Sequence, residues 1–155
     1  MSEIIDNKLF LGDIFDANNE KELQCKNITC VICVAEDITI KINDPNIKVY
    51  KYNLQDTYDC DISLYFDEIG ALIDGEKSVL VNCAAGISRS STIVISYLMK
   101  YHGLKLKEAL VGVRDKRNII CPNKRFLKYL FEYEKFIFGK NEIEWDEIVQ
   151  LCYYN

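Results

Sequence analysis

The chain of 155 residues has few histidines and prolines and no long apolar run. Its single histidine, His102, argues against the common metal sites, which need two or three imidazoles, so we expect no metal and no cofactor. No apolar stretch approaches the roughly 20 residues of a membrane span, and the N-terminal segment lacks the basic and apolar regions of a secretory signal. These absences argue against a membrane or exported protein.

Basic residues are also in the minority, with 19 Lys and Arg against 24 Asp and Glu and a net charge of −5. This balance disfavours a general nucleic-acid binder but leaves room for a local phosphate site. Seven cysteines, an odd number, favour reduced thiols and an intracellular protein, so we expect it in the cytoplasm, with the nucleus as an alternative. The length predicts one domain over residues 1–155, with residues 143–155 as a C-terminal helical extension.

Apolar periodicity and turn residues predict an α/β fold. Strands are expected at residues 8–12, 27–35, 47–54 and 78–82, and helices at 15–25, 62–73, 90–102, 106–114, 123–138 and 143–153. Asp13 and Asp61 are expected to cap the first two helices, and Ile47, Val49 and Tyr50 to face a core. Alternating strands and helices predict a parallel or mixed sheet covered by helices, with ligands beyond the carboxyl ends of the strands.

The loop Cys83-Ala84-Ala85-Gly86-Ile87-Ser88-Arg89, followed by Ser90, connects a buried strand to a helix. Small residues and Gly86 allow the loop to curl, so that its backbone N–H groups form an anion-binding nest. The helix N-terminus adds further N–H groups, and Arg89 can bind two phosphate oxygens with its planar guanidinium. The same positive field favours the thiolate of Cys83, which is then a nucleophile aimed at the bound anion.

Attack of this sulfur on phosphorus would give a phosphocysteine that water hydrolyses, with Ser90 placed to hydrogen-bond the departing sulfur. The leaving oxygen needs a proton from a general acid. Asp56, which directly follows a predicted strand, is the first candidate and Asp59 the second, whereas Asp61 suits a helix cap. A solvated turn is the alternative reading of this cluster.

These motifs resemble the protein tyrosine phosphatase superfamily, and most closely its small, atypical dual-specificity phosphatases. Besides the cysteine loop, the resemblance covers the segments at 8–12 and 27–34 and the later Arg117…Pro122-Asn123…Phe126-Leu127 pattern. It implies an α/β domain with a mixed central sheet, no metal, and phosphotyrosine and phosphoserine or phosphothreonine in proteins as substrates. It also implies that Cys83 is the nucleophile, Arg89 the phosphate clamp, Asp56 the general acid and Ser90 the partner of the leaving thiolate, with residues 84–89 binding substrate.

One departure from the family is Asn82, which stands where a histidine usually precedes the cysteine. Asparagine can donate a hydrogen bond but carries no charge, so we expect a weaker bias toward the thiolate, with a lower rate or a higher pH optimum. Asn82 also motivates an alternative, a phosphoresidue-binding pseudophosphatase. A third hypothesis keeps the enzyme but changes the substrate to an RNA 5′-phosphate or a phosphoinositide.

Several other residues invite more than one interpretation. Cys30 and Cys33 lie within a predicted strand and are expected to pack in the core. Cys60 or Cys121 is a candidate for a reversible disulfide with Cys83. One group of basic residues stands out in this acidic chain: Arg114, Lys116, Arg117, Lys124 and Arg125. We interpret it either as a surface that steers acidic substrates toward the site or as a solvated helix face. The segment 143–153 is expected to pack on the body, with docking or dimerisation as the alternative, so we expect a monomer or a weak homodimer.

Overall fold

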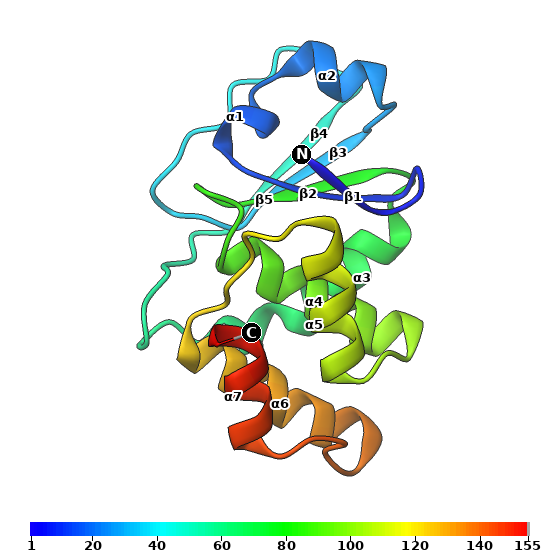
Figure 1. Ribbon diagram of the computed structural model, residues 1–155. Helices are drawn as coiled ribbons and strands as arrows, with labels where there is room; N and C mark the ends of the chain where they lie inside the picture. Colours follow the sequence, from blue (N-terminus) through cyan, green and yellow to red (C-terminus); the bar gives the residue numbers. More distant parts are fainter. Residues whose placement is uncertain (155) are drawn as a thin grey trace.

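The computed structural model describes residues 1–154 and shows a five-stranded sheet between two layers of helices (Figure 1). The strands are β1 (Ser2–Ile5), β2 (Leu9–Gly12), β3 (Cys30–Cys33), β4 (Lys48–Lys51) and β5 (Val79–Asn82). Their order in the sheet is β1-β2-β5-β3-β4, with β1 antiparallel to β2 and all other neighbours parallel. The sheet is therefore mixed, and the predicted single-domain α/β fold is confirmed.

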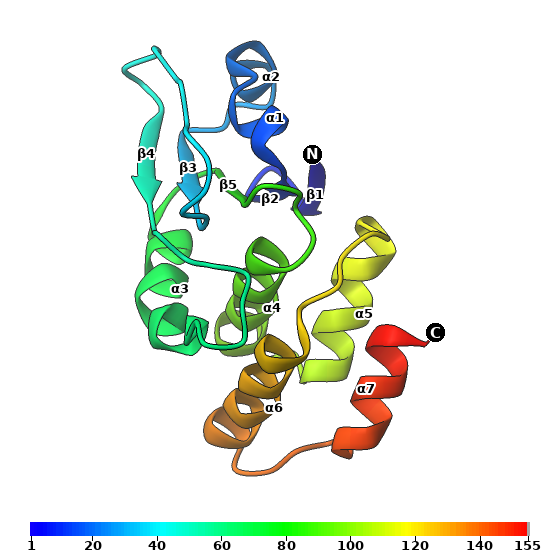
Figure 2. The ribbon, with the colours of Figure 1, turned by 90° about the vertical axis from the view of Figure 1, so that its left-hand side faces the viewer.

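The helices cover both faces of the sheet. They are α1 (Ile14–Ala17), α2 (Glu20–Cys25), the 3-10 helix η1 (Ile62–Tyr65), α3 (Phe66–Gly75), α4 (Arg89–His102), α5 (Leu106–Lys116), α6 (Lys124–Phe138) and α7 (Trp145–Tyr153). Helices α1 and α2 lie on one face, whereas α3, α4, α5 and α6 lie on the other, with α7 outside them (Figures 1 and 2). No helix within residues 1–154 is both long and apolar enough to cross a bilayer.

Alternation along the strands divides the apolar interior into two cores. In β5, Val79 and Val81 belong to the larger core beneath α3–α6, and Leu80 belongs to the smaller core beneath α1 and α2. In β3, Ile32 likewise belongs to the larger core and Val31 to the smaller one. Both central strands are fully buried, as expected of parallel strands covered on two faces.

The N-terminal segment differs from the sequence expectation. The helix expected at residues 15–25 is two short helices, because Asn18 and Asn19 bond to nearby backbone instead of continuing one helix. Asn19 caps α2 by accepting a hydrogen bond from the N–H of Glu22, and Asn18 donates to the carbonyl of Thr39. Strand β1 was not expected at all.

The expectation that Val49 in strand β4 faces a core is wrong. Val49 is 43% exposed, because β4 is the edge strand and one of its faces is open to solvent. Ile47 is buried and Tyr50 packs partly against the larger core, as expected. The caps at Asp13 and Asp61 are confirmed, although the helix after Asp61 begins as the 3-10 turn η1.

Candidate active site

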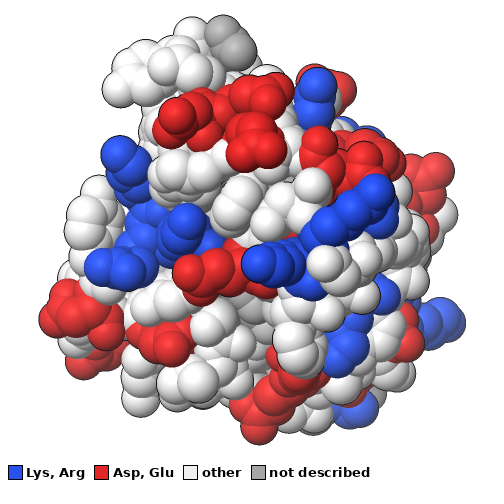
Figure 3. Space-filling view, turned by 90° about the horizontal axis from the view of Figure 1, so that it is seen from below, with Lys and Arg blue, Asp and Glu red and all other residues white. Residues whose placement is uncertain are grey.

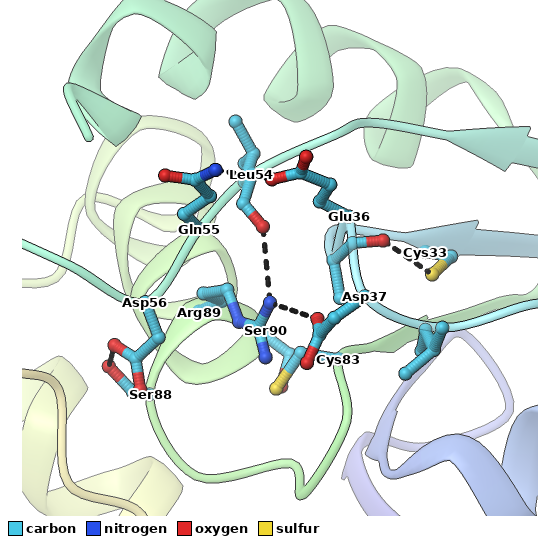
Figure 4. A network of polar contacts seen from close by, with 12 residues as sticks. Cys33, Glu36, Asp37, Leu54, Gln55, Asp56, Cys83, Ser88, Arg89 and Ser90 are labelled. Carbon is cyan, nitrogen blue, oxygen red and sulfur yellow. Dashed lines mark hydrogen bonds and ion pairs between the residues drawn. The ribbon is translucent and has the colours of Figure 1, made fainter.

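The carboxyl ends of four parallel strands meet at one edge of the sheet. The loop Cys83–Ser88 leaves β5 at this edge, and α4 begins at Arg89 directly after it. The segments that follow β3 and β4 bring Asp37 and Asp56 to the same edge (Figure 4). Chain segments distant in sequence therefore converge around Cys83.

The carbonyls of the cysteine loop accept hydrogen bonds from neighbouring groups of the protein. Their donors are Asn82 Nδ2 to Cys83, the N–H of Ile14 to Ala84, Arg117 Nη2 to Ala85, Arg117 Nε to Gly86, the N–H of Cys121 to Ile87, and the N–H of Thr92 to Ser88. Within residues 1–154, none of the backbone N–H groups of residues 84–88 donates a hydrogen bond to the protein. The loop therefore has the polarity of an anion-binding nest.

Gly86 makes this curvature sterically accessible. Its φ is +66°, a left-handed conformation that glycine adopts without the steric cost of a Cβ atom. A Cβ atom here would lie 2.6 Å from the carbonyl oxygen of Gly12 and 2.5 Å from Arg117 Nη2. The loop thus packs directly against the end of β2 and against Arg117.

Cys83 lies at the base of the loop and is 2% exposed. Its Sγ is 3.1 Å from the Oγ of Ser90, in the first turn of α4. The strand end and the helix start bring these two side chains together, as the sequence predicts. Ser90 is fully buried, so its hydroxyl is fixed beside the sulfur.

Arg89 is held from one side only. Its Nη1 donates to Asp37 Oδ1 at 2.6 Å and to the carbonyl of Leu54 at 3.1 Å (Figure 4). Its Nε is buried and has no hydrogen-bond partner within residues 1–154. Burial opposes the charge, but the hydrogen bond to Asp37 and the neighbouring Cys83 raise the pKa of Arg89 above its ordinary value. The guanidinium is thus a fixed cation with donors left over for a ligand.

Asp56 lies over the opposite side of the loop. Its Oδ1 accepts a hydrogen bond from Ser88 Oγ at 2.7 Å (Figure 4). It accepts a second one from Asn123 Nδ2 at 2.9 Å. Ser88 Oγ also accepts a hydrogen bond from the N–H of Asn123, at 2.9 Å. Both bonds to the carboxylate end on Oδ1, so Oδ2 is the oxygen left to exchange a proton.

The other two acidic candidates are placed differently. Asp61 caps η1 through the N–H of Ser63, as expected. Asp59 is exposed, and no hydrogen bond joins it to the cysteine loop within residues 1–154. Of the three carboxylates, it is Asp56 that the structure joins to the loop.

Two residues at the site, Asp37 and Asn123, had no role assigned from the sequence, and Arg117 was interpreted only as a member of the basic group. Asp37 holds Arg89, Asn123 holds Asp56, and Arg117 holds two carbonyls of the loop. Asp37 carried a usable signal, because it follows a buried parallel strand just as Cys83 does. Asn123 and Arg117 come from the far side of α5, and only the tertiary structure brings them here.

Asn82 is fully buried at the end of β5. Its Nδ2 donates to the carbonyl of Cys83 at 3.3 Å, so the amide supports the loop as a hydrogen-bond donor. Its Oδ1 is buried with no partner within residues 1–154. The expected effect of Asn82 on rate and pH optimum stays a prediction.

The remaining cysteines are all free thiols. Cys30 and Cys33 are buried in β3, which confirms the core interpretation, and burial raises the pKa of Cys30 to about 12. Burial raises the pKa of the Cys121 thiol above its ordinary value. The disulfide of Cys60 or Cys121 with Cys83 stays a prediction.

Comparison with known proteins shows the family to which the chain belongs. Residues 9–136 match the family model of the dual specificity phosphatase catalytic domain. Mouse dual specificity protein phosphatase 14 is 40% identical over 144 residues, which span 90% of this chain and 72% of that protein. The chain belongs to the dual-specificity phosphatase family. The predicted family and the predicted function of protein phosphatase are thereby confirmed, and neither the pseudophosphatase nor the RNA or phosphoinositide alternative is favoured.

Solved structures agree with this assignment. The crystal structure of DUSP15 is 30% identical, with a TM-score of 0.80 and coverage of 86% of each chain. The crystal structure of human DUSP28 has a TM-score of 0.83 and covers 90% of this chain and 99% of that one. At 24% identity the second comparison supports the fold alone. Helix α7 lies outside the segment that the family model matches.

Proposed function

We propose that the protein removes phosphate from phosphotyrosine and from phosphoserine or phosphothreonine in proteins through a phosphocysteine on Cys83. One observation carries this proposal: within residues 1–154, the backbone N–H groups of the loop that follows the buried Cys83 and the Nε of Arg89 have no hydrogen-bond partner in the protein. These donors suit the three equatorial oxygens of a phosphoryl group in transfer, and they are already oriented before substrate binds. The loop residues 84–88 bind through their backbone, and Arg89 binds through Nε and Nη2.

In the first step, the Cys83 thiolate forms a bond to phosphorus as the bond from phosphorus to the ester oxygen breaks. Asp56, protonated on Oδ2, gives its proton to that oxygen, so the leaving group departs as a neutral alcohol or phenol. The hydrogen bonds from Ser88 and Asn123 to Oδ1 fix the orientation of the carboxyl group. The phosphoryl group keeps its charge as it moves to sulfur, and the negative charge lost by the thiolate ends on the carboxylate of Asp56.

In the second step, water attacks the phosphocysteine. Asp56, now ionised, takes a proton from the water, and the bond from phosphorus to sulfur breaks. Ser90 Oγ, 3.1 Å from Sγ, donates a hydrogen bond to the thiolate as it leaves. Inorganic phosphate is released, and Cys83 and Asp56 return to their starting protonation states.

Two variants test the mechanism. Phosphate release from a phosphopeptide or a small aryl phosphate is measured with a chelator present. Cys83→Ser is expected to abolish turnover, and Arg89→Lys to lower kcat/KM by at least about a hundredfold, because lysine cannot supply the bidentate fork. Unchanged turnover in either variant, or loss of the native activity on adding the chelator, would sink the mechanism.

We also propose a monomeric, cytoplasmic enzyme that acts on proteins, without nucleic acid or membrane as a partner. Large apolar side chains with high exposure come from separate segments; they are Phe15, Val49, Tyr58, Leu64, Ile119, Phe136 and Tyr154. The seven unpaired cysteines and the net charge of −5 support a reducing compartment and disfavour nucleic acid. Sedimentation velocity and fractionation of cells test these two points.

A further inference from the structure

Residues 121–123 form the connector that leads into α6, and this connector bonds to the catalytic site. The N–H of Asn123 donates to Ser88 Oγ at 2.9 Å, and its Nδ2 donates to Asp56 Oδ1 at 2.9 Å. Because Ser88 Oγ also donates to Asp56 Oδ1, at 2.7 Å, the three residues form a closed set of contacts. A shift of the connector therefore moves the carboxyl group of the proposed general acid.

Helix α7 binds the connector at its middle residue. Tyr153 Oη donates a hydrogen bond to the carbonyl of Pro122 at 2.6 Å. Pro122 lies between Asn123 and Cys121, and the N–H of Cys121 donates to the carbonyl of Ile87 in the cysteine loop at 2.9 Å. A hydroxyl of α7 thus holds the connector between the two residues that bond to the catalytic site.

The chemistry of proline gives this contact its importance. Pro122 has no N–H, so its carbonyl is the one backbone group through which a hydrogen bond can hold it. The fixed φ of proline also leaves the connector little freedom, so a displacement of this carbonyl is passed on to Asn123. Burial raises the pKa of the Tyr153 hydroxyl above its ordinary value, so the hydroxyl remains a donor at neutral and acidic pH.

Helix α7 is itself held on the body, which makes Tyr153 a fixed donor. Ile148 is fully buried in the larger core, and Arg114 Nη1 donates to the carbonyl of Leu151. Acidic and basic side chains are interspersed over the lower face of the molecule, where α6 and α7 reach the surface (Figure 3). The attachment of α7 therefore rests on these particular contacts rather than on a surface charge of one sign.

We propose that Tyr153 is a positioning residue for the phosphatase reaction, because its hydroxyl fixes residues 121–123 and, through them, the carboxyl group of Asp56. This inference rests on the proposed function, since it takes Asp56 as the general acid. Tyr153 lies in α7, beyond the residues 9–136 that match the family model, so the family match does not supply this role.

The effect of the hydroxyl should fall on proton donation more than on nucleophilic attack. The cysteine loop is also held by Arg117 and by the N–H of Ile14, which do not depend on the connector. Asp56 Oδ1, in contrast, is held by Ser88 and Asn123, which both bond to each other. Loss of the contact from α7 therefore leaves the loop in place and loosens the carboxyl group.

The test uses Tyr153→Phe, which removes the hydroxyl and keeps the ring. The kcat/KM is measured on a series of aryl phosphates, because a weakly acidic phenol needs a proton from the general acid and a strongly acidic one does not. We expect kcat/KM to fall about five- to tenfold for the least acidic phenols, as for the loss of one hydrogen bond, and by less than about twofold for the most acidic. Asp56→Asn should show the same dependence on the leaving group with a larger loss.

Two further variants make the result specific. Tyr154→Phe makes the same chemical change at the next position, where the side chain is 72% exposed, and should leave the whole series unchanged. The double variant Tyr153→Phe/Asp56→Asn should be no slower than Asp56→Asn alone, because the hydroxyl acts through that carboxyl group. An unchanged series for Tyr153→Phe, an equal loss across the series, or additive losses in the double variant would overturn the inference.

Hydrogen exchange separates this inference from the proposed function. The N–H groups of Cys121 and Asn123 are protected by their bonds to the cysteine loop, and they should exchange faster in Tyr153→Phe than in the native protein or in Tyr154→Phe. Equal exchange in all three proteins would overturn the inference. A native protein that turns over no substrate refutes only the proposed function, since exchange still shows whether the hydroxyl holds the connector. If Asp56→Asn changes the dependence on the leaving group and Tyr153→Phe does not, only the positioning role is refuted.

Discussion

At the residue scale, the site depends on how each catalytic side chain is held from behind. Asp37 and the carbonyl of Leu54 both bind Nη1 of Arg89, which directs the rest of the guanidinium toward the loop. Ser88 and Asn123 both donate hydrogen bonds to Oδ1 of Asp56, which fixes the orientation of its carboxyl group. In each case one edge of the functional group is bound to the protein, and the other edge stays available to the substrate.

Asp37 gives a pH-dependent prediction. Its hydrogen bond from Arg89 lowers the pKa of the carboxyl group below its ordinary value. A lowered native pKa means that the stabilisation is present above the unfolded value of about 3.9 and is lost as pH falls through the native value. Because the side chain is 61% exposed, Asp37→Asn should cost less than about 1 kcal/mol.

Chemical unfolding from pH 7 to pH 3 measures this effect. The difference between the native protein and Asp37→Asn should be constant above about pH 5 and should shrink below about pH 4, where the unfolded and then the native carboxyl is protonated. A difference that grows as the pH falls would contradict the assigned ion pair.

At the element scale, the loop between β5 and α4 has its shape because surrounding groups bind its carbonyls. The sequence alone predicts that Cys83, Gly86 and Arg89 belong to an anion-binding loop, because a strand, small residues and a helix follow one another along the chain. Arg117 and Asn123 could not be predicted in this way, because they reach the loop from across α5 and nothing local in the sequence specifies that contact. The break between α1 and α2 likewise arose from side-chain bonds of Asn18 and Asn19 that helical periodicity does not reveal.

Gly86→Ala tests the packing of this loop. The new Cβ would meet the carbonyl oxygen of Gly12 at 2.6 Å in a left-handed backbone conformation, so the loop must shift. We expect phosphatase activity to fall by at least about a hundredfold, because small displacements of positioning groups are costly, and stability to fall by roughly 1–3 kcal/mol. Gly112→Ala in α5 is the control.

A Cβ at Gly112 meets nothing within 4 Å, so that substitution should raise stability by about 0.5–1 kcal/mol and leave activity unchanged. Activity and thermal unfolding of the two variants are compared with the native protein. A fully active Gly86→Ala enzyme would show that the loop does not need this conformation.

At the scale of the whole molecule, α7 is part of the same folded body as the catalytic core. Ile148 is fully buried in the larger core, and Arg114 Nη1 and Tyr153 Oη bond across to the carbonyls of Leu151 and Pro122. The sequence predicted packing of residues 143–153, and the structure places this helix against α6. The structure also shows that Trp145 lines a pocket together with Lys124, Arg125 and Lys128. The helical periodicity of the sequence does not predict this contact.

Ile148→Ala tests whether α7 contributes to the stability of the domain. Removing a fully buried isoleucine side chain should lower the free energy of unfolding by about 2–5 kcal/mol. Gln150→Ala, at an exposed position of the same helix, should change it by less than about 0.5 kcal/mol. Equal stability of both variants in denaturant unfolding would mean that α7 does not pack on the body in solution.

The central claim is that sulfur of Cys83 attacks phosphorus and carries the phosphoryl group. The most direct measurement is to quench the Ser90→Ala variant during turnover of a small aryl phosphate and to map covalent phosphate by mass spectrometry. Without the hydroxyl 3.1 Å from Sγ, departure of the thiolate should slow, and a phosphoryl group should accumulate on Cys83. Steady turnover with no phosphate on any cysteine, or phosphate on a different residue, would contradict the account.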